Sequence, residues 1–250
     1  MTRRSRTSSQ NGITRRSYLG AIGVAGTIST AGCITDILDD GPEGVVLDPQ
    51  EDQLADSEAL DYPAYGQQFP SFELTDPVAE TTIDTGRLDR TALVTAFFAF
   101  CPAECGVLIN QLAGIQAMAD ARGLTDELVV LPITFDPERD DAEALQENAD
   151  TWGADLDLGN WHYLRPEDEA EAETIVQDQL GIGYERVDEE DEEIRAGIPD
   201  YDFLHIVVTF LVNPDGVVER AYRGEEFGDG HNRETIVEEI ETIVAAFDGE

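Results

Sequence analysis

The sequence predicts an α/β domain, and two observations carry that prediction. Apolar residues recur at helical spacing in Glu104–Ala121. Three continuous apolar runs have the pattern of strands buried in a central sheet: Ala92–Phe100, Leu128–Phe135 and Ile206–Val212. Because the helical segment lies between the first two runs, the order strand, helix, strand is typical of an α/β fold.

Local signals predict the remaining elements. Phe69–Leu88 alternates apolar and polar residues around turn signals, which predicts an N-terminal hairpin. Gly123 ends the first helix. The other predicted elements are helices at Asp140–Trp152, Pro166–Leu180 and Thr235–Phe247, strands at Trp161–Leu164 and Val217–Tyr222, and a solvated acidic loop at Asp188–Glu193. This order is that of a thioredoxin-like fold, with a central mixed sheet flanked by helices.

The charge balance limits the kind of partner that the chain can bind. Its 250 residues include 54 acidic and 15 basic side chains, for a formal net charge of −39. Such a surface repels a phosphate backbone, so we expect no nucleic-acid partner. The acid-rich composition without lysine resembles that of proteins from extreme halophiles, which stay soluble in concentrated salt. Hydrophobic residues make up 41% of the chain, which is enough for a folded core.

The N-terminus has the pattern of an export signal. Arg15 and Arg16 precede a short apolar run, which predicts a twin-arginine signal over residues 1–32. The run ends in Thr30-Ala31-Gly32-Cys33, which resembles a lipobox, so Cys33 is the predicted lipidated residue. An uncleaved N-terminal anchor is the alternative interpretation. Either one places the domain outside the cytoplasm, on the outer face of the cytoplasmic membrane.

The rest of the chain divides into a tether and a domain. Residues 33–61 are rich in acids and glycine and have no sustained apolar period, which predicts a flexible, solvated tether. The folded domain is expected to cover residues 62–250.

Two cysteines with three residues between them follow the first predicted strand. Cys101 ends that strand, and Cys105 lies in the first turn of the next helix, with Pro102 placed to begin it. The positive potential of a helix N-terminus stabilises a thiolate, which is both a nucleophile and a ligand for soft metals. A functional thiol pair is the favoured interpretation, and buried core cysteines or a permanent disulfide are the alternatives.

A histidine far downstream, His205, opens the third predicted strand. Taken alone, it is better interpreted as a core histidine at a strand edge. Beside two thiolates, a neutral imidazole favours Cu(I) among biological metals, whereas structural zinc prefers four protein ligands. The sequence leaves open whether Cu(II) also binds. His162 and His231 lack acidic or thiol company at useful spacing, so we expect them at the surface.

The chain resembles the Sco/SenC family from about Phe69 to the C-terminus. Three motifs in order carry the resemblance: Cys101-Pro102-Ala103-Glu104-Cys105, Asp136-Pro137-Glu138-Arg139-Asp140, and His205 leading a strand to Asn213-Pro214-Asp215-Gly216. The resemblance implies a thioredoxin-like fold that binds copper through Cys101, Cys105 and His205. It also implies a role in assembling the binuclear copper centre of cytochrome oxidase.

The resemblance extends to Asp136 and departs at two other positions. Asp136 resembles an acid that the family uses near the copper loop, and it is equally well placed to cap the following turn. Many members have proline after the second cysteine and aspartate before the histidine, where this chain has Gly106 and Leu204.

Two functions are compatible with these motifs. The first is a lipid-anchored copper metallochaperone that delivers copper, by ligand exchange, to the oxidase subunit carrying the binuclear copper site. The second is a thiol–disulfide oxidoreductase, in which Cys101 and Cys105 reduce the cysteines of that site. The second is less favoured because a thioredoxin pair has two intervening residues, and Leu204-His205 replaces the cis-proline expected before the third strand.

Overall fold

The described part of the chain belongs to one compact unit, which spans Asp40–Glu250. In this computed structural model the described residues are 42–50, 53–101, 104–187, 203–224 and 232–249, all within that unit. The predicted export signal and Cys33 therefore lie outside the described residues. Among the helices that are described, none has the length and hydropathy of a membrane-spanning segment.

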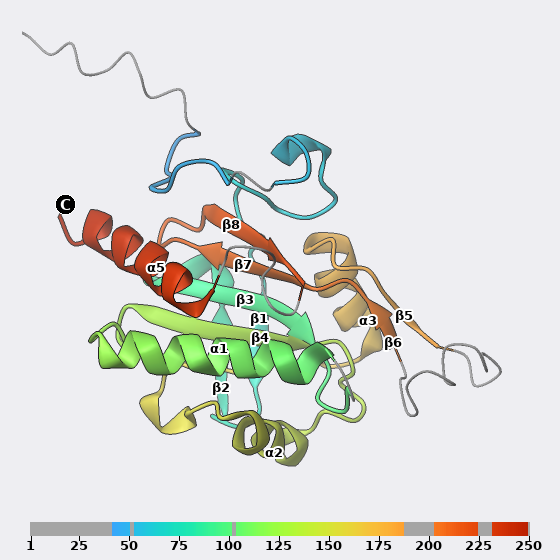
Figure 1. Ribbon diagram of the computed structural model, residues 1–250. Coiled ribbons are helices and arrows are strands. Elements are labelled where there is room, and N and C mark those ends of the chain that lie inside the picture. The colour runs from blue at the N-terminus through green and yellow to red at the C-terminus, as the bar shows by residue number, and fades with distance from the viewer. Residues whose placement is uncertain (1–41, 51–52, 102–103, 188–202, 225–231, 250) are drawn as a thin grey trace, which may run out of the picture. The chain divides into compact units, whose positions relative to one another are not determined.

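A four-stranded mixed sheet forms the centre of the described unit (Figure 1). Its strands run in the order β4 (Leu128–Thr134), β3 (Thr91–Phe97), β7 (Val208–Val212) and β8 (Val218–Arg223). β3 pairs parallel with β4 and antiparallel with β7, and β8 returns antiparallel beside β7. The mixed sheet predicted from the sequence is confirmed.

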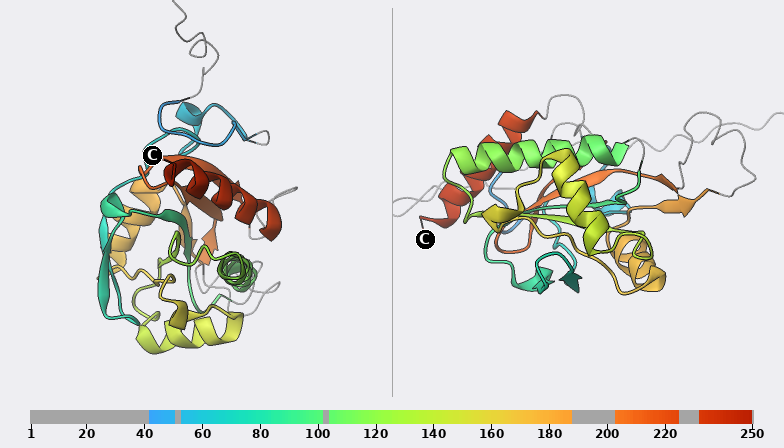
Figure 2. Two further views of the ribbon diagram at one scale, coloured as in Figure 1. Left: turned by 90° about the vertical axis from the view of Figure 1, so that its left-hand side faces the viewer. Right: turned by 90° about the horizontal axis from the view of Figure 1, so that it is seen from below.

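Helices and a hairpin cover the two faces of this sheet. α1 (Glu104–Ala121) and α5 (Arg233–Phe247) lie side by side on one face. Figure 2 shows α3 (Glu169–Ala172) and the hairpin of β1 (Glu73–Asp76) and β2 (Thr81–Asp84) on the opposite side. Because both faces are covered, every residue of β3 is buried, which explains the continuous apolar run in its sequence.

The shorter elements complete the layers. Asp141 caps α2 by accepting hydrogen bonds from two backbone N–H groups of its first turn. Gly153, in the left-handed conformation, ends the same helix. The elements not yet placed are α2 (Ala142–Trp152), the 3-10 turns η1 (Ser57–Ala59), η2 (Thr85–Arg87) and η3 (Leu156–Leu158), the π-helical segment η4 (Glu173–Gln179), and strands β5 (Tyr184–Arg186) and β6 (Phe203–His205).

Several predicted elements have different bounds in the structure. The strand expected at Ile206–Val212 begins only at Val208, as β7. His205 ends a separate strand, β6, and does not open β7. The strand expected at Trp161–Leu164 contributes only two isolated bridges to β4. The helix expected at Pro166–Leu180 is α3 followed by η4. The predicted loop at Asp188–Glu193 lies outside the described residues.

The expectation of a flexible tether up to residue 61 is wrong for residues 42–50, which we call the strap. Leu47 is buried in the main core. The carboxylate of Glu219 on β8 is fully buried and accepts hydrogen bonds from Val46 N at 2.9 Å and Leu47 N at 3.0 Å. A buried carboxylate needs such donors, so β8 fixes the strap.

Candidate metal centre

The two cysteines lie where β3 leads into α1. The backbone N–H of Cys101 donates to the carbonyl of Phe98 in the loop that follows β3. Cys105 lies in the first turn of α1, and its backbone N–H points to Cys101 Sγ at 3.4 Å. No disulfide joins the two cysteines. The structure has the predicted strand-to-helix junction, but β3 ends at Phe97, so Cys101 lies in the loop after the strand and does not end it. Pro102 lies outside the described residues.

His205 completes a cluster with these thiols. Its Nε2 lies 3.5 Å from Cys105 Sγ. One ligand atom from each of Cys101, Cys105 and His205 lies within 4.8 Å of the other two, and no other such cluster occurs among the described residues. Two sulfurs and one imidazole nitrogen form a donor set suited to a soft metal ion.

The position of His205 follows from the short sheet of β5 and β6. Its register pairs Tyr184 with His205 and Arg186 with Phe203. The imidazole packs against the rings of Phe98 and Phe135, with centroids 6.0 and 5.2 Å away. Its Nδ1 lies 3.3 Å from the carbonyl of Ile206. A proton held at Nδ1 by that carbonyl leaves the Nε2 lone pair directed toward Cys105.

Burial sets the protonation state of the second thiol. Cys105 is 1% exposed. Burial raises the pKa of the Cys105 thiol well above its usual value, and contact with Cys101 and the charge of Glu104 act in the same direction. We expected the helix N-terminus to favour a thiolate here, but desolvation outweighs it. A bound cation would therefore have to displace the thiol proton.

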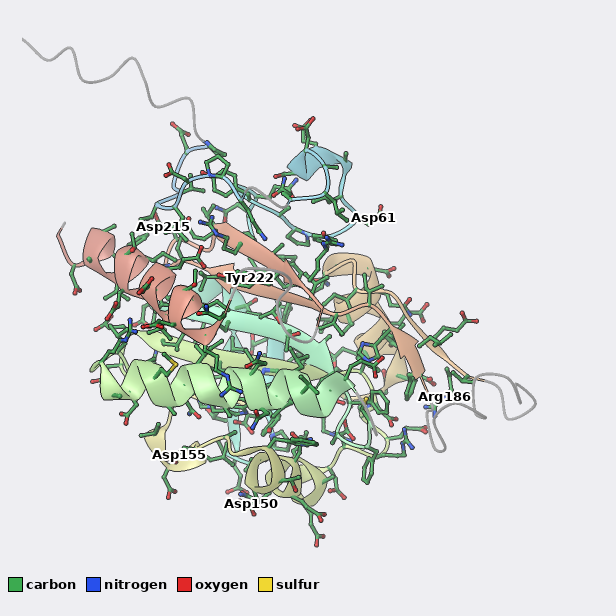
Figure 3. The ribbon with its side chains drawn as sticks, in the orientation of Figure 1. Asp61, Asp150, Asp155, Arg186, Asp215 and Tyr222 are labelled. Atoms are coloured by element: carbon green, nitrogen blue, oxygen red, sulfur yellow. The ribbon has the colours of Figure 1, made fainter. Side chains whose placement is uncertain are left out.

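Asp136 is buried near the cluster but outside it. The residue is 1% exposed. Its carboxylate pairs with Arg139 through Oδ2, and its Oδ1 lies 3.6 Å from the guanidinium of Arg186. Arg186 also lies over the ring of Phe203, 4.5 Å from the centroid. Through Arg186, Asp136 therefore holds in place the β5–β6 sheet that carries His205. The sequence had suggested either an acid near the copper loop or a cap of the following turn, and neither interpretation included this contact. Figure 3 labels Arg186 at that end of the domain.

A second buried acid, Asp140, holds the loop before Cys101. Its Oδ2 accepts hydrogen bonds from the Ala99 backbone N–H, at 2.9 Å, and from the Thr134 hydroxyl. Burial raises the pKa of Asp140 to about 6, opposed in part by these hydrogen bonds. Sequence reasoning noted Asp140 only as the last residue of a motif and as the start of a helix, which in the structure begins at Ala142. No spacing rule shows that it reaches a backbone N–H some forty residues earlier.

Gly106 leaves room for a neighbouring helix. A Cβ atom built at this position would lie 2.2 Å from the ring of Trp152, the last residue of α2. The departure from proline after the second cysteine is therefore matched by a bulky residue on α2.

His162 does not have the surface position expected of it. Its Nδ1 lies 2.9 Å from a carboxylate oxygen of Asp76, and its side chain is 17% exposed. The acid is 86 residues away in the sequence, so local spacing could not show it. His231 lies outside the described residues.

Comparison with known proteins gives the fold and the family. The sequence profile of the SCO1/SenC family matches residues 63–245, whereas no curated protein matches the chain. A SCO1/SenC family lipoprotein from Bacillus anthracis has 16% identity and a TM-score of 0.57, over 71% of this chain and 95% of that one.

Two further solved structures are similar to this chain. Bradyrhizobium japonicum ScoI with copper bound has 16% identity and a TM-score of 0.55, over 71% of this chain and 99% of that one. BsSco is described as having a disulfide switch and as belonging to the Sco family of cytochrome c oxidase assembly proteins. It has 16% identity and a TM-score of 0.54, over 75% of this chain and 98% of that one. These identities show a shared fold, and the profile match over most of the chain shows that it belongs to the SCO1/SenC family.

Proposed function

We propose that this chain binds one copper ion through Cys101, Cys105 and His205 and delivers it to the binuclear copper site of a cytochrome oxidase subunit. The observation that carries the proposal is the convergence of these three donors within 4.8 Å on a SCO1/SenC fold. The copper-bound ScoI of Bradyrhizobium japonicum supports copper as the ion. The assignment of BsSco to oxidase assembly supports the direction of delivery.

The donor set fits a cargo that must be held and then released. Thiolate and neutral imidazole favour Cu(I). Three protein ligands leave the ion open to ligands of an incoming protein, so transfer can proceed by ligand exchange. Cys101 is 8% exposed and His205 is partly exposed, whereas Cys105 is 1% exposed. Cys101 and His205 are therefore the ligands that an acceptor reaches first.

The experiment is an anaerobic Cu(I) titration of the reduced domain, followed by desalting and metal analysis. We expect one copper per chain in the parent protein. Cys101→Ser and Cys105→Ser should each lose retention while circular dichroism stays native. Asn110→Ser, an exposed substitution on the same helix, serves as control. Full retention in both cysteine variants would overturn the proposal.

We also propose that the domain is exported and held on the outer face of the cytoplasmic membrane by a lipid on Cys33. The support is the pattern of Arg15-Arg16 followed by Thr30-Ala31-Gly32-Cys33. Cys33→Ser should release the protein from membranes or block its processing. Membrane retention at an unchanged processed mass would favour an uncleaved anchor instead.

A thiol–disulfide oxidoreductase is the second candidate, because the two cysteines are adjacent and BsSco is described as having a disulfide switch. In that reaction the two thiols would become a disulfide as a partner's disulfide becomes two thiols. The raised pKa of Cys105 disfavours that thiol as the attacking nucleophile. Insulin reduction at the rate of a thioredoxin, without copper transfer to an apo oxidase domain, would favour this candidate.

A further inference from the structure

The exposed apolar side chains gather around the ligand cluster. Five large hydrophobic residues are exposed among those described, and four belong to segments that carry the ligands. Phe100 precedes Cys101, and Val107 follows Cys105 by two residues on α1. Leu204 and Ile206 flank His205. We call these four residues, which are 40 to 53% exposed, the apolar rim: Phe100, Val107, Leu204, Ile206.

This rim is unusual for the chain that carries it. The sequence has 54 acidic residues, and a surface of that kind is strongly hydrated. Single exposed hydrophobic residues need no explanation, but a group of them around one site marks a place of contact with another molecule. Three separate segments contribute to the rim, namely the loop after β3, α1 and the segment around β6. Its gathering therefore arises from the fold and not from one apolar stretch of sequence.

Two hollows, each lined in part by carboxylates, lie beside the rim. The first, about 460 Å³, is lined by His205, Leu204 and Ile206 together with Glu104 and Glu185. The second, about 290 Å³, is lined by Phe100 and Cys101 together with Glu147 and Trp152. Leu204 and Ile206 thus share a hollow with Glu104 and Glu185, whereas Phe100 lies beside Glu147 and also 5.5 Å, at its ring centroid, from the Arg139 guanidinium. A complementary surface would be apolar at its centre, with basic side chains at the edge that faces Glu104 and Glu185.

We propose that the apolar rim is the docking surface for the protein that exchanges copper with this chain. The partner we infer has apolar side chains around its own copper-binding thiols and Arg or Lys at the periphery. This inference rests on the proposed function. Cys105 is 1% exposed. Ligands of an acceptor can therefore reach a metal bound to Cys105 only when the surfaces of the two proteins are in close contact. Contact between apolar surfaces supplies the attraction and excludes water from the exchange.

A second copy of this chain is a poorer occupant. Two such surfaces would bring Glu104, Glu147 and Glu185 of one molecule against the same residues of the other. Like charges that meet across an interface oppose association. Self-association through the rim is therefore an outcome that would contradict the proposal.

The test measures association and copper retention separately. The probe is a purified apo binuclear-copper domain of a cytochrome oxidase, and its dissociation constant with the copper-loaded chain is measured by calorimetry in concentrated salt. Leu204→Ser and Val107→Ser remove rim side chains from two different elements. Leu54→Ser is the matched control, because Leu54 is 63% exposed and is the exposed large hydrophobic residue outside the rim among those described.

Each rim variant should raise the dissociation constant about tenfold, whereas Leu54→Ser should leave it unchanged. Copper retention after desalting should equal that of the parent in all three variants. Equal affinities in parent and rim variants, an equal loss in the Leu54 control, dimerisation through the rim, or no association of the parent chain would each overturn the docking proposal. The copper-binding proposal fails only if the parent chain itself retains no copper, so the two failures are distinguishable.

Discussion

The two ends of the described unit use buried carboxylates in different ways. At the strap, Glu219 accepts hydrogen bonds from Val46 N, Leu47 N and the Asn213 amide. At the ligand end, one oxygen each of Asp136 and Asp140 is buried without a hydrogen bond. Figure 3 labels Asp215, in the turn between β7 and β8 next to the strap, and Arg186, on the side of the ligand cluster, at opposite sides of the domain.

This difference separates a region that secures the fold from one that serves a site. Fully bonded buried groups stabilise a fold and define one arrangement of it. Buried oxygens without hydrogen bonds, a raised carboxyl pKa and an exposed apolar rim all cost stability. These features lie together around Cys101, Cys105 and His205, where we propose that copper binds. If the division holds, substitutions at the two ends should differ in their effect on the free energy of unfolding.

Glu219→Ala should have the largest effect on stability. It leaves two backbone N–H groups and the Asn213 amide buried without their acceptor, so the free energy of unfolding should fall by about 3 to 5 kcal/mol. Urea denaturation of the apo protein measures it. Glu43→Ala, exposed in the same strap, is the control. Equal stability of both variants would show that the strap does not secure the fold.

Asp140 should make stability depend on pH. Its pKa in the folded protein is about 6, above the unfolded value of about 3.8. The folded state therefore holds the proton more tightly, and the contribution is complete below pH 3.8 and lost as the pH rises through 6. Between these values the parent should lose about 2 to 3 kcal/mol relative to Asp140→Asn. Urea denaturation at pH 4 and pH 7.5 checks this, with Glu138→Gln as the exposed control. A constant difference between parent and Asp140→Asn would contradict it.

Gly106→Ala should lower the free energy of unfolding by about 2 kcal/mol, because the new methyl group overlaps the Trp152 ring. Thermal denaturation of the single variant and of Gly106→Ala combined with Trp152→Leu makes the comparison. The methyl group should cost less when Trp152 is already replaced. A cost that is the same in both backgrounds would show that this contact is not responsible.

Arg186→Gln should have the smallest effect on stability and a larger one on copper. Arg186 is 47% exposed, so the loss in the free energy of unfolding should stay below about 1 kcal/mol. Release of the β5–β6 sheet from Asp136 should weaken Cu(I) affinity several-fold, as measured by competition with a chelator. Arg87→Gln, in a surface pair with Asp84, is the control. Arg186→Gln should also be made in the His205→Ala background. If it lowers Cu(I) affinity there by as much as in the parent chain, Arg186 does not act through His205.

The sequence allowed the central elements to be predicted because their causes are local. A strand that is covered on both faces, such as β3, needs apolar residues at every position. In α1, the apolar residues likewise recur at helical spacing because they lie on the face of the helix that is buried. The thiol pair could be predicted as well, because the two cysteines are only four residues apart in the sequence and lie at one strand-to-helix junction.

Other features depend on partners that are distant in the sequence. Leu47 N and its acceptor Glu219 are 172 residues apart, so local patterning predicts a tether where the structure has the strap. The three residues of β6 are too few to show a strand pattern, which is why the sequence assigns His205 to the next strand. Asp136 could be singled out from its motif, but its pairing with Arg186 depends on how the β5–β6 sheet folds back.

The contact between Gly106 and Trp152 also restricts how this family member could have diverged. Any side chain at residue 106 overlaps the indole ring of Trp152. A substitution of Gly106 therefore depends on which residue occupies position 152. Proline at residue 106 would bring the same Cβ overlap, so it fits beside residue 152 only when that side chain is smaller than tryptophan. Among related sequences, a residue larger than glycine at the first position should therefore occur with a small residue at the second.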